Sequence, residues 1–152
     1  MPVPDSIING TLTGVNIRGR YVGPYTFCNM TSLTNVTGEL RFVDEYSFYG
    51  CTQLTNSSLN FSRLDYIGYN AFKNCTGLSG TLDLGGVTYI GSGAFAGCTN
   101  ITGIKLSSFH CAIGDSSAFP SSVTTIAVPA DYVDVYKVSF GWEKIADKIV
   151  AA

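Results

Sequence analysis

The fold of this 152-residue chain is decided by the stretch Ile67-Gly-Tyr-Asn-Ala-Phe-Lys-Asn-Cys-Thr-Gly-Leu78, which recurs as Ile90-Gly-Ser-Gly-Ala-Phe-Ala-Gly-Cys-Thr-Asn-Ile101. Looser copies surround three further phenylalanines, so that successive members of the series are 21, 24, 23 and 24 residues apart: Phe27, Phe48, Phe72, Phe95 and Phe119. Self-similarity at a fixed period of roughly 20–50 residues is typical of proteins that stack one small unit on the next. The sequence therefore predicts a solenoid.

A second recurring feature is a short run in which two apolar residues enclose a third: Val15-Asn-Ile17, Leu40-Arg-Phe42, Leu59-Asn-Phe61, Leu82-Asp-Leu84, Ile104-Lys-Leu106 and Ile126-Ala-Val128. Period-two alternation of this kind indicates a half-buried strand. Each unit then has a strand, a second short extended stretch ending in Ile-Gly, and a compact Ala-Phe turn. We expect one parallel sheet of about six short strands along a right-handed solenoid.

The tail has a different period. Tyr132, Val133 and Tyr136, and then Trp142, Ile145 and Ile149, recur at helical spacing. A stack of repeats would otherwise present a bare apolar end, so we expect these residues to form short capping helices. The predicted organisation is a repeat domain over residues 1–128 and a C-terminal helical cap over residues 129–152.

The pattern Ile-Gly-x-x-Ala-Phe-x-x-Cys-Thr-x-(Leu/Ile) resembles the BspA-like leucine-rich repeat family, over roughly residues 11–128. The resemblance implies a leucine-rich-repeat solenoid of the α/β horseshoe class, dominated by β structure. It also implies a protein of the bacterial cell surface or a secreted protein, because the family is mostly found there. Adhesion and the binding of host or matrix proteins are the activities that the family suggests.

The composition excludes several classes of protein. With 45% hydrophobic and only 13% charged residues the chain is not intrinsically disordered. A net charge of −2 provides no basic field for nucleic acid. No apolar run approaches the roughly 20 residues of a membrane span, and Met1–Gly10 has no features of a leader peptide. One histidine in the whole chain weakens most acid-base enzyme mechanisms.

Five cysteines raise the question of disulfides or a metal site. Three of them share one repeat position, which Met30 fills in an earlier copy: Cys51, Cys75 and Cys98. A thioether shares the apolar bulk of a thiol but can neither bridge nor act as a thiolate ligand, so we expect this row to pack beside the phenylalanines. Cys28 and Cys111 lie too far apart along the array to pair. The hypothesis is five free thiols and no cofactor.

Two other motifs are weak candidates, one for dinucleotide binding and one for a Cys-His catalytic pair. Gly91-Ser-Gly-Ala-Phe-Ala96 matches GxGxxA, but a turn replaces the helix that a dinucleotide site requires. His110 and Cys111 are neighbours in sequence, and neighbours on an extended segment point to opposite faces. We therefore expect a chain without enzymatic activity.

Two sets of residues are candidates for partner binding. The first comprises the middle residues of the alternating runs, expected as a polar strip on the sheet: Asn16, Arg41, Asn60, Asp83, Lys105 and Ala127. Its alternative is a solvated face with a weak Asp83–Lys105 pair. The second comprises tyrosines, with Tyr21, Tyr66 and Tyr89 before the Val or Ile of the second stretch and Tyr25 and Tyr46 two residues before a phenylalanine. These tyrosines either bind a partner or form a structural ladder.

The expected function is a non-enzymatic module for protein–protein interaction or adhesion. Two alternatives stay open: a structural spacer or repeat fragment of a larger surface array, and a glycan-binding module. Repeat folds host many partners, so the sequence names none of them.

Overall fold

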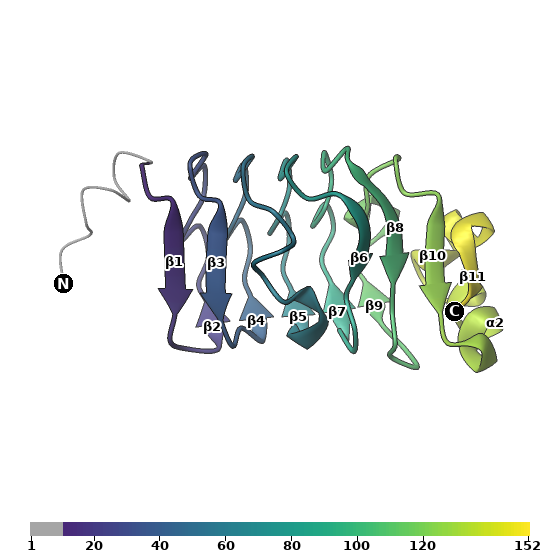
Figure 1. Cartoon of the computed structure of the whole chain (residues 1–152). Coiled ribbons are helices and arrows are strands. Elements are labelled where there is room, and N and C mark those ends of the chain that lie inside the picture. Colours follow the sequence, from purple (N-terminus) through teal and green to yellow (C-terminus); the bar gives the residue numbers. More distant parts are fainter. Residues whose placement is uncertain (1–10) are drawn as a thin grey trace.

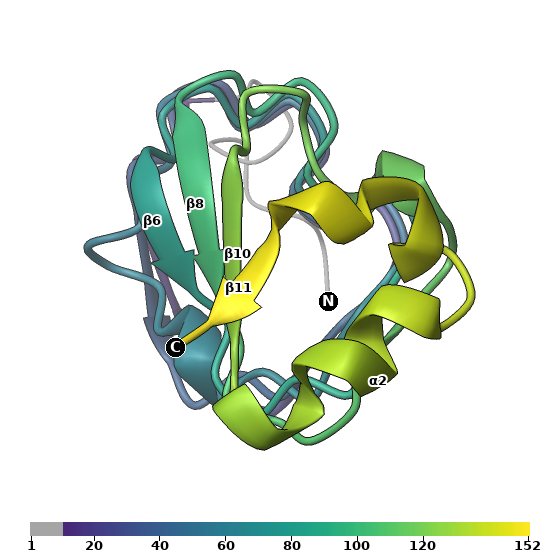
Figure 2. The ribbon, with the colours of Figure 1, turned by 90° about the vertical axis from the view of Figure 1, so that its right-hand side faces the viewer.

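A computed structural model describes residues 11–152, which form an elongated coil of stacked repeats (Figure 1). Viewed along the axis of the coil, the repeats superimpose and the C-terminal helices lie across one end (Figure 2). The predicted solenoid of short parallel strands is confirmed. Residues 1–10, with which the predicted repeat domain begins and in which no leader features were found, lie outside the described residues.

One side of the coil, here called the first face, carries six strands: β1 (Gly14–Ile17), β3 (Asn35–Gly38), β6 (Gly80–Asp83), β8 (Ile101–Lys105), β10 (Thr125–Val128) and β11 (Ile149–Ala151). All their pairings are parallel. They form two separate sheets, since β1 pairs with β3 and the other four strands follow the order β6-β8-β10-β11.

Another side, the second face, carries a five-stranded parallel sheet with its strands in chain order: β2 (Tyr21–Val22), β4 (Phe42–Val43), β5 (Tyr66–Ile67), β7 (Tyr89–Ile90) and β9 (Ala112–Ile113). The expectation of a single sheet is therefore corrected. The second extended stretch of each repeat was predicted, but its pairing with the same stretch in the next repeat was not. Stacking brings the stretches into register, and their backbone groups then pair.

Two of the six predicted strand runs are placed differently. Leu40-Arg-Phe42 is not a strand of the first face, because β3 is formed by Asn35–Gly38 and Phe42 begins β4 on the second face. A Cβ at Gly38, whose φ is +124°, would overlap the Ile17 carbonyl. The run Leu59-Asn-Phe61 leads into a short 3-10 helix, η1 (Phe61–Arg63), instead of a strand. Both runs still bury their apolar residues, apart from Phe42, which is why alternation alone did not distinguish them.

The core consists of columns of equivalent residues. The five phenylalanine rings lie in one stack, with ring centroids 5.3, 5.2, 5.5 and 6.4 Å apart in chain order. Beside it, the inward residues of the second face form a buried column of Val22, Val43, Ile67, Ile90 and Ile113. Each repeat therefore buries its apolar side chains mainly against its two neighbours.

The tail covers the C-terminal end of these columns. It contains η3 (Ala130–Tyr132), α2 (Val133–Val138) and η4 (Trp142–Lys148). Trp142 and Tyr136 are fully buried, and the Trp142 indole lies 5.7 Å from the Phe119 ring and donates a 2.7 Å hydrogen bond to the Cys111 carbonyl. The last residues are not helical, because Ile149–Ala151 form β11 and extend the sheet of the first face.

A candidate binding surface of exposed aromatic side chains

Four aromatic side chains lie side by side on the outer surface of the second face. Tyr21, Phe42, Tyr66 and Tyr89 are the first residues of β2, β4, β5 and β7, and the strand register pairs each with the next. Tyr21 is 57% exposed, Phe42 44% and Tyr66 37%, whereas the following residue of every strand is buried. The Tyr66 and Tyr89 rings stack at 5.1 Å. We call these four residues the aromatic row.

A second group of rings lies on the turns that follow these strands. Tyr25 and Tyr46 stack nearly parallel with 4.7 Å between centroids, and Tyr46 also contacts Tyr49 and Tyr69 at 5.5 Å each. Tyr25 and Tyr69 are about half exposed. We call these four residues the tyrosine cluster.

The backbone at Tyr25 and Tyr46 is in the left-handed region, with φ of 59° and 55°. The equivalent positions of the next two repeats hold Asn70 and Gly93, the residue types that adopt this conformation most easily. Bulky residues are rare there and typically cost about 1–3 kcal/mol. Tyrosine at two successive repeats is therefore unfavourable for the backbone, and the ring contacts of the tyrosine cluster offset this cost.

A carboxylate contacts the first tyrosine of the aromatic row. The Tyr21 hydroxyl donates a 2.6 Å hydrogen bond to Asp44 Oδ2, and this bond raises the pKa of Tyr21 above its ordinary value. Partial desolvation by neighbouring groups raises the pKa of Tyr66 and of Tyr25. At neutral pH these three hydroxyls are protonated, so Tyr25 and Tyr66 can donate to a partner, whereas the Tyr21 hydrogen is already donated to Asp44.

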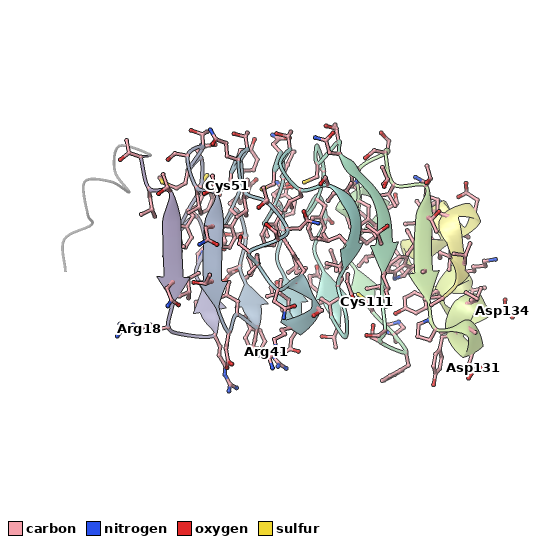
Figure 3. The ribbon with its side chains drawn as sticks, in the orientation of Figure 1. Arg18, Arg41, Cys51, Cys111, Asp131 and Asp134 are labelled. Atoms are coloured by element: carbon pink, nitrogen blue, oxygen red, sulfur yellow. The ribbon has the colours of Figure 1, made fainter. Side chains whose placement is uncertain are left out.

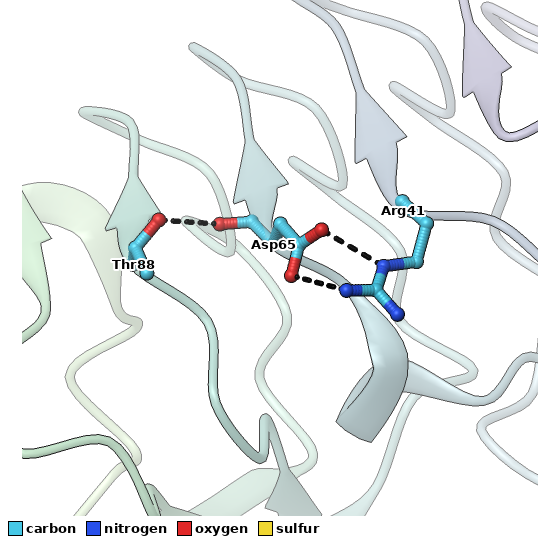
Figure 4. Close-up of polar contacts among 3 residues, drawn as sticks. All are labelled: Arg41, Asp65 and Thr88. Carbon is cyan, nitrogen blue, oxygen red and sulfur yellow. Dashed lines mark hydrogen bonds and ion pairs between the residues drawn. The ribbon is translucent and has the colours of Figure 1, made fainter.

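Arg41 lies at the edge of the aromatic row, in an ion pair. Its guanidinium donates to both carboxylate oxygens of Asp65, at 2.8 and 3.0 Å, and the Thr88 hydroxyl donates to the Asp65 carbonyl at 3.0 Å (Figure 4). These three residues each precede a strand of the second face. Figure 3 shows Arg41 projecting at the lower edge of the molecule, beyond the arrowheads of the first-face strands.

The residues of the expected polar strip therefore do not lie in one line. Asn16 is on β1 opposite Thr37, and Asp83 and Lys105 are neighbours in the register of β6 and β8, next to Ala127 on β10. Arg41 belongs to the second face, and Asn60 precedes η1, where its Oδ1 accepts a 2.6 Å hydrogen bond from Ser62. Within residues 11–152 no ion pair joins Asp83 to Lys105. The strip is divided because the third repeat forms no first-face strand.

Three aromatic residues of this surface were missed by sequence reasoning. Phe42 was assigned to a strand of the other face, although it directly precedes Val43 as Tyr66 precedes Ile67. Tyr49 and Tyr69 occupy turn positions without an aromatic residue in most repeats, so no periodic signal marked them. Tyr66 and Tyr89 lie where the second stretch was expected, stacked and partly exposed.

The cysteine row lies inside the coil. Cys51, Cys75 and Cys98 are fully buried, and their thiols donate to the carbonyls of Phe27, Phe48 and Phe72 at 3.0–3.1 Å. Burial raises the pKa of Cys51 and Cys98 to about 12 and that of Cys75 well above its ordinary value. Met30, at the same repeat position, is only partly buried.

All five cysteines are free thiols, and only Cys28 is partly exposed. Burial raises the pKa of Cys111 to about 12, so its thiol is not an activated nucleophile. His110 packs its ring 6.4 Å from that of Tyr136. In the described part of the chain no three His, Cys, Asp or Glu residues are grouped so that they could hold a metal ion. None of the helices described there has the length and apolar character needed to cross a membrane.

Comparison with known proteins agrees with this architecture. The sequence model of the BspA type leucine rich repeat region matches residues 15–146 in six copies. The fold is similar to the crystal structure of a leucine-rich repeat protein from Bacteroides ovatus, with a TM-score of 0.68 and 28% sequence identity over 93% of this chain. The match spans 36% of the length of that protein. No curated protein sequence matches the chain.

Proposed function

The chain belongs to the BspA-type leucine-rich repeat family, and from that premise we propose that it is a non-enzymatic module that binds a partner protein through the aromatic row and the tyrosine cluster. The family suggests a protein-interaction repeat module. Proteins of this construction use extended surfaces, with several repeats each contributing a few contacts. The observation that carries the proposal is the exposure of aromatic rings on consecutive repeats of one face.

The exposed rings are not required by the core. On the second face the buried residue of each strand already fills the interior, and the preceding residue could be polar, as on a solvated sheet. Contiguous exposed apolar area on a monomer marks an interaction site more often than isolated exposed residues do. Tyrosine is enriched in protein interfaces because its ring contributes area and its hydroxyl a hydrogen bond.

The rigidity of the surface favours binding. The aromatic row stands on paired strands, and the Tyr21 hydroxyl is held by Asp44. Side chains that are already ordered lose little conformational entropy when a partner binds. Asp44 and Glu45 lie beside the rings, whereas Asp65 is already paired with Arg41. A partner surface with Arg or Lys between apolar groups would complement the carboxylates of Asp44 and Glu45.

We place this activity at the bacterial cell surface or outside the cell, in adhesion. Family membership supports this location, because BspA-type repeats are typically associated with the bacterial surface. The competing role is a spacer within a longer array, for which exposed aromatic rings on successive repeats would have no use.

The experiment is a binding assay of residues 1–152 against a panel of extracellular matrix proteins by biolayer interferometry. The double variant Tyr66→Ser/Tyr89→Ser should bind the best panel member at least tenfold more weakly. The second double variant, Tyr25→Asn/Tyr46→Asn, should also bind more weakly, with little change in its melting temperature, because asparagine relieves the left-handed backbone and thereby offsets the lost ring contacts.

The control is Tyr132→Ser, which removes an exposed ring from the C-terminal tail. It should bind like the parent chain. Unchanged affinity in both tyrosine double variants would contradict the proposed surface. Loss of stability together with loss of binding in both would favour a structural tyrosine ladder.

A further inference from the structure

The first face is interrupted at the third repeat. Strands β3 and β6 are the facing edges of two separate sheets, and residues 55–60 between them form no strand but contain a turn at residues 56–58, followed by η1. Figure 2 shows a loop projecting outward beside β6. A sheet that is otherwise continuous along the coil therefore has a gap in its middle.

The outer edge of β6 has backbone groups without partners. The N–H groups of Gly80 and Leu84 donate toward β8, to the carbonyls of Asn100 and Lys105. In a parallel ladder alternate residues direct their N–H and C=O groups to opposite sides, so those of Thr81 and Asp83 face the gap. Among the described residues, no backbone hydrogen bond joins Thr81 or Asp83 to the third repeat.

The third repeat contacts its neighbours there through side chains instead. The Asn56 amide donates a 2.9 Å hydrogen bond to the Ser79 carbonyl, just before β6. The Ser58 hydroxyl accepts a 3.2 Å hydrogen bond from the Val36 N–H of β3. The edge of β3 is thus partly satisfied, whereas the edge of β6 is open.

A hollow of about 490 Å³ lies along this open edge. Its walls are residues 56–62 of the third repeat and residues 81–83 of β6, and most of the lining side chains are hydroxyls, amides or the Asp83 carboxylate. Asp83 Oδ1 accepts from the Gly85 N–H at 2.8 Å, which turns this carboxylate toward its own chain.

We propose that this interruption is a strand-addition site that takes an extended peptide segment of a partner protein. The free N–H and C=O groups of Thr81 and Asp83 are two residues apart, about 6.6 Å along a strand, which is the spacing that an added strand presents. Free edge groups of this kind are the usual template for peptide addition to a sheet. A peptide of three or four residues would pair with β6 while its side chains contact the polar wall of the hollow.

The shape of the gap favours one short segment over a second sheet. The loop of the third repeat borders the hollow, so a broad edge-to-edge contact between two sheets is sterically blocked. The site is on the first face and does not rest on the aromatic row or the tyrosine cluster.

The test begins with selection of random octapeptides displayed on phage against residues 1–152, with counter-selection against Thr81→Pro. Proline removes the Thr81 N–H and places its ring at the open edge. Enriched peptides are then synthesised and their affinities measured. We expect at least tenfold weaker binding to Thr81→Pro and full binding to Thr81→Val, which keeps the N–H. Each enriched peptide is also made in two N-methylated forms, one methylated at the odd residues and one at the even residues. The form whose methyl groups block the N–H groups that face β6 should bind at least tenfold more weakly.

Amide hydrogen exchange of the parent chain gives a readout that depends on no variant. The Thr81 and Asp83 amides should exchange fast in the free chain and slow at least tenfold with bound peptide, while Leu82, which faces β8, is protected in both states. Tyr66→Ser/Tyr89→Ser should bind the peptides like the parent, which separates this site from the proposed function. Failure to enrich peptides over Thr81→Pro, or unchanged exchange at Thr81 and Asp83 in the bound state, would overturn the proposal.

Discussion

Replacing Cys98 by alanine should make the stability of the protein less sensitive to alkaline pH. Cys98 is fully buried, and burial raises the pKa of its thiol from 9.0 to about 12. The folded-state value is above the unfolded one, so the protonated thiol contributes its full stabilisation below pH 9. This contribution is lost as the pH rises from 9 toward 12, because only the unfolded chain ionises there.

The magnitude follows from proton linkage. With pKa values of 9.0 and about 12, one thiol lowers the free energy of unfolding by roughly half a kcal/mol at pH 9 and by about 1–2 kcal/mol at pH 10, relative to pH 7. At pH 7 the variant should be less stable by about 1–2 kcal/mol, because it loses the sulfur atom from the core and the hydrogen bond to the Phe72 carbonyl. The difference between parent and variant should therefore nearly vanish at pH 10.

Urea unfolding at pH 7, 8, 9 and 10 in the presence of a reductant measures this difference. Fluorescence of Trp142, the single tryptophan, reports the transition, and every other ionisable group is common to both proteins. Cys28→Ala is the control, because Cys28 is partly exposed and should change the pH dependence less. A stability difference for Cys98→Ala that stays constant from pH 7 to pH 10 would refute the assignment of a buried, protonated thiol.

Other consequences of the stacking can be tested separately. In native protein a chromogenic thiol reagent should modify Cys28 alone, and five thiols should react in denaturant without reductant; a count below five would reveal a disulfide. Gly91→Ala should destabilise by about 2 kcal/mol or more, since a Cβ there would lie 2.6 Å from the backbone of the preceding repeat. Gly86→Ala, where an added Cβ would have no neighbour within 4 Å, should be nearly neutral, and equal melting temperatures for the two variants would count against close backbone packing. Deleting Trp142–Ala152 should give aggregated protein, because it exposes the Phe119 end of the phenylalanine stack and removes β11; a soluble truncation that unfolds cooperatively would contradict a capping role.

Residues that repeat with the period of the chain were predictable from the sequence. The phenylalanine and cysteine positions recur in successive copies, and the stack of rings and the row of thiols follow from placing equivalent residues above one another. The helical part of the tail was also predictable, because its apolar spacing differs from that of the repeats. Ile149–Ala151 join a sheet instead, because β10 offers them a free edge.

The candidate surface was only partly predictable. Tyr21, Tyr66 and Tyr89 carried a signal because they precede a conspicuous Val or Ile. The sequence signal at Phe42 was ambiguous. Phe42 precedes Val43, as expected for the second face, but it also ends the run Leu40-Arg-Phe42, which has the alternation of a first-face strand. Apolar alternation gives the spacing of a strand but not the sheet to which the strand belongs.

The sequence by itself determined that this protein is a stack of thin repeats with a covered end, because a fixed period forces equivalent residues into columns that exclude water. Only the tertiary structure decided which outer residues are neighbours. It brought four aromatic side chains together on the second face and left the edge of β6 open on the first. Both features depend on strand pairing between repeats. This pairing is set by the register of the backbone and by whether a given segment is extended. The local sequence pattern of a single repeat specifies neither the register nor the extension.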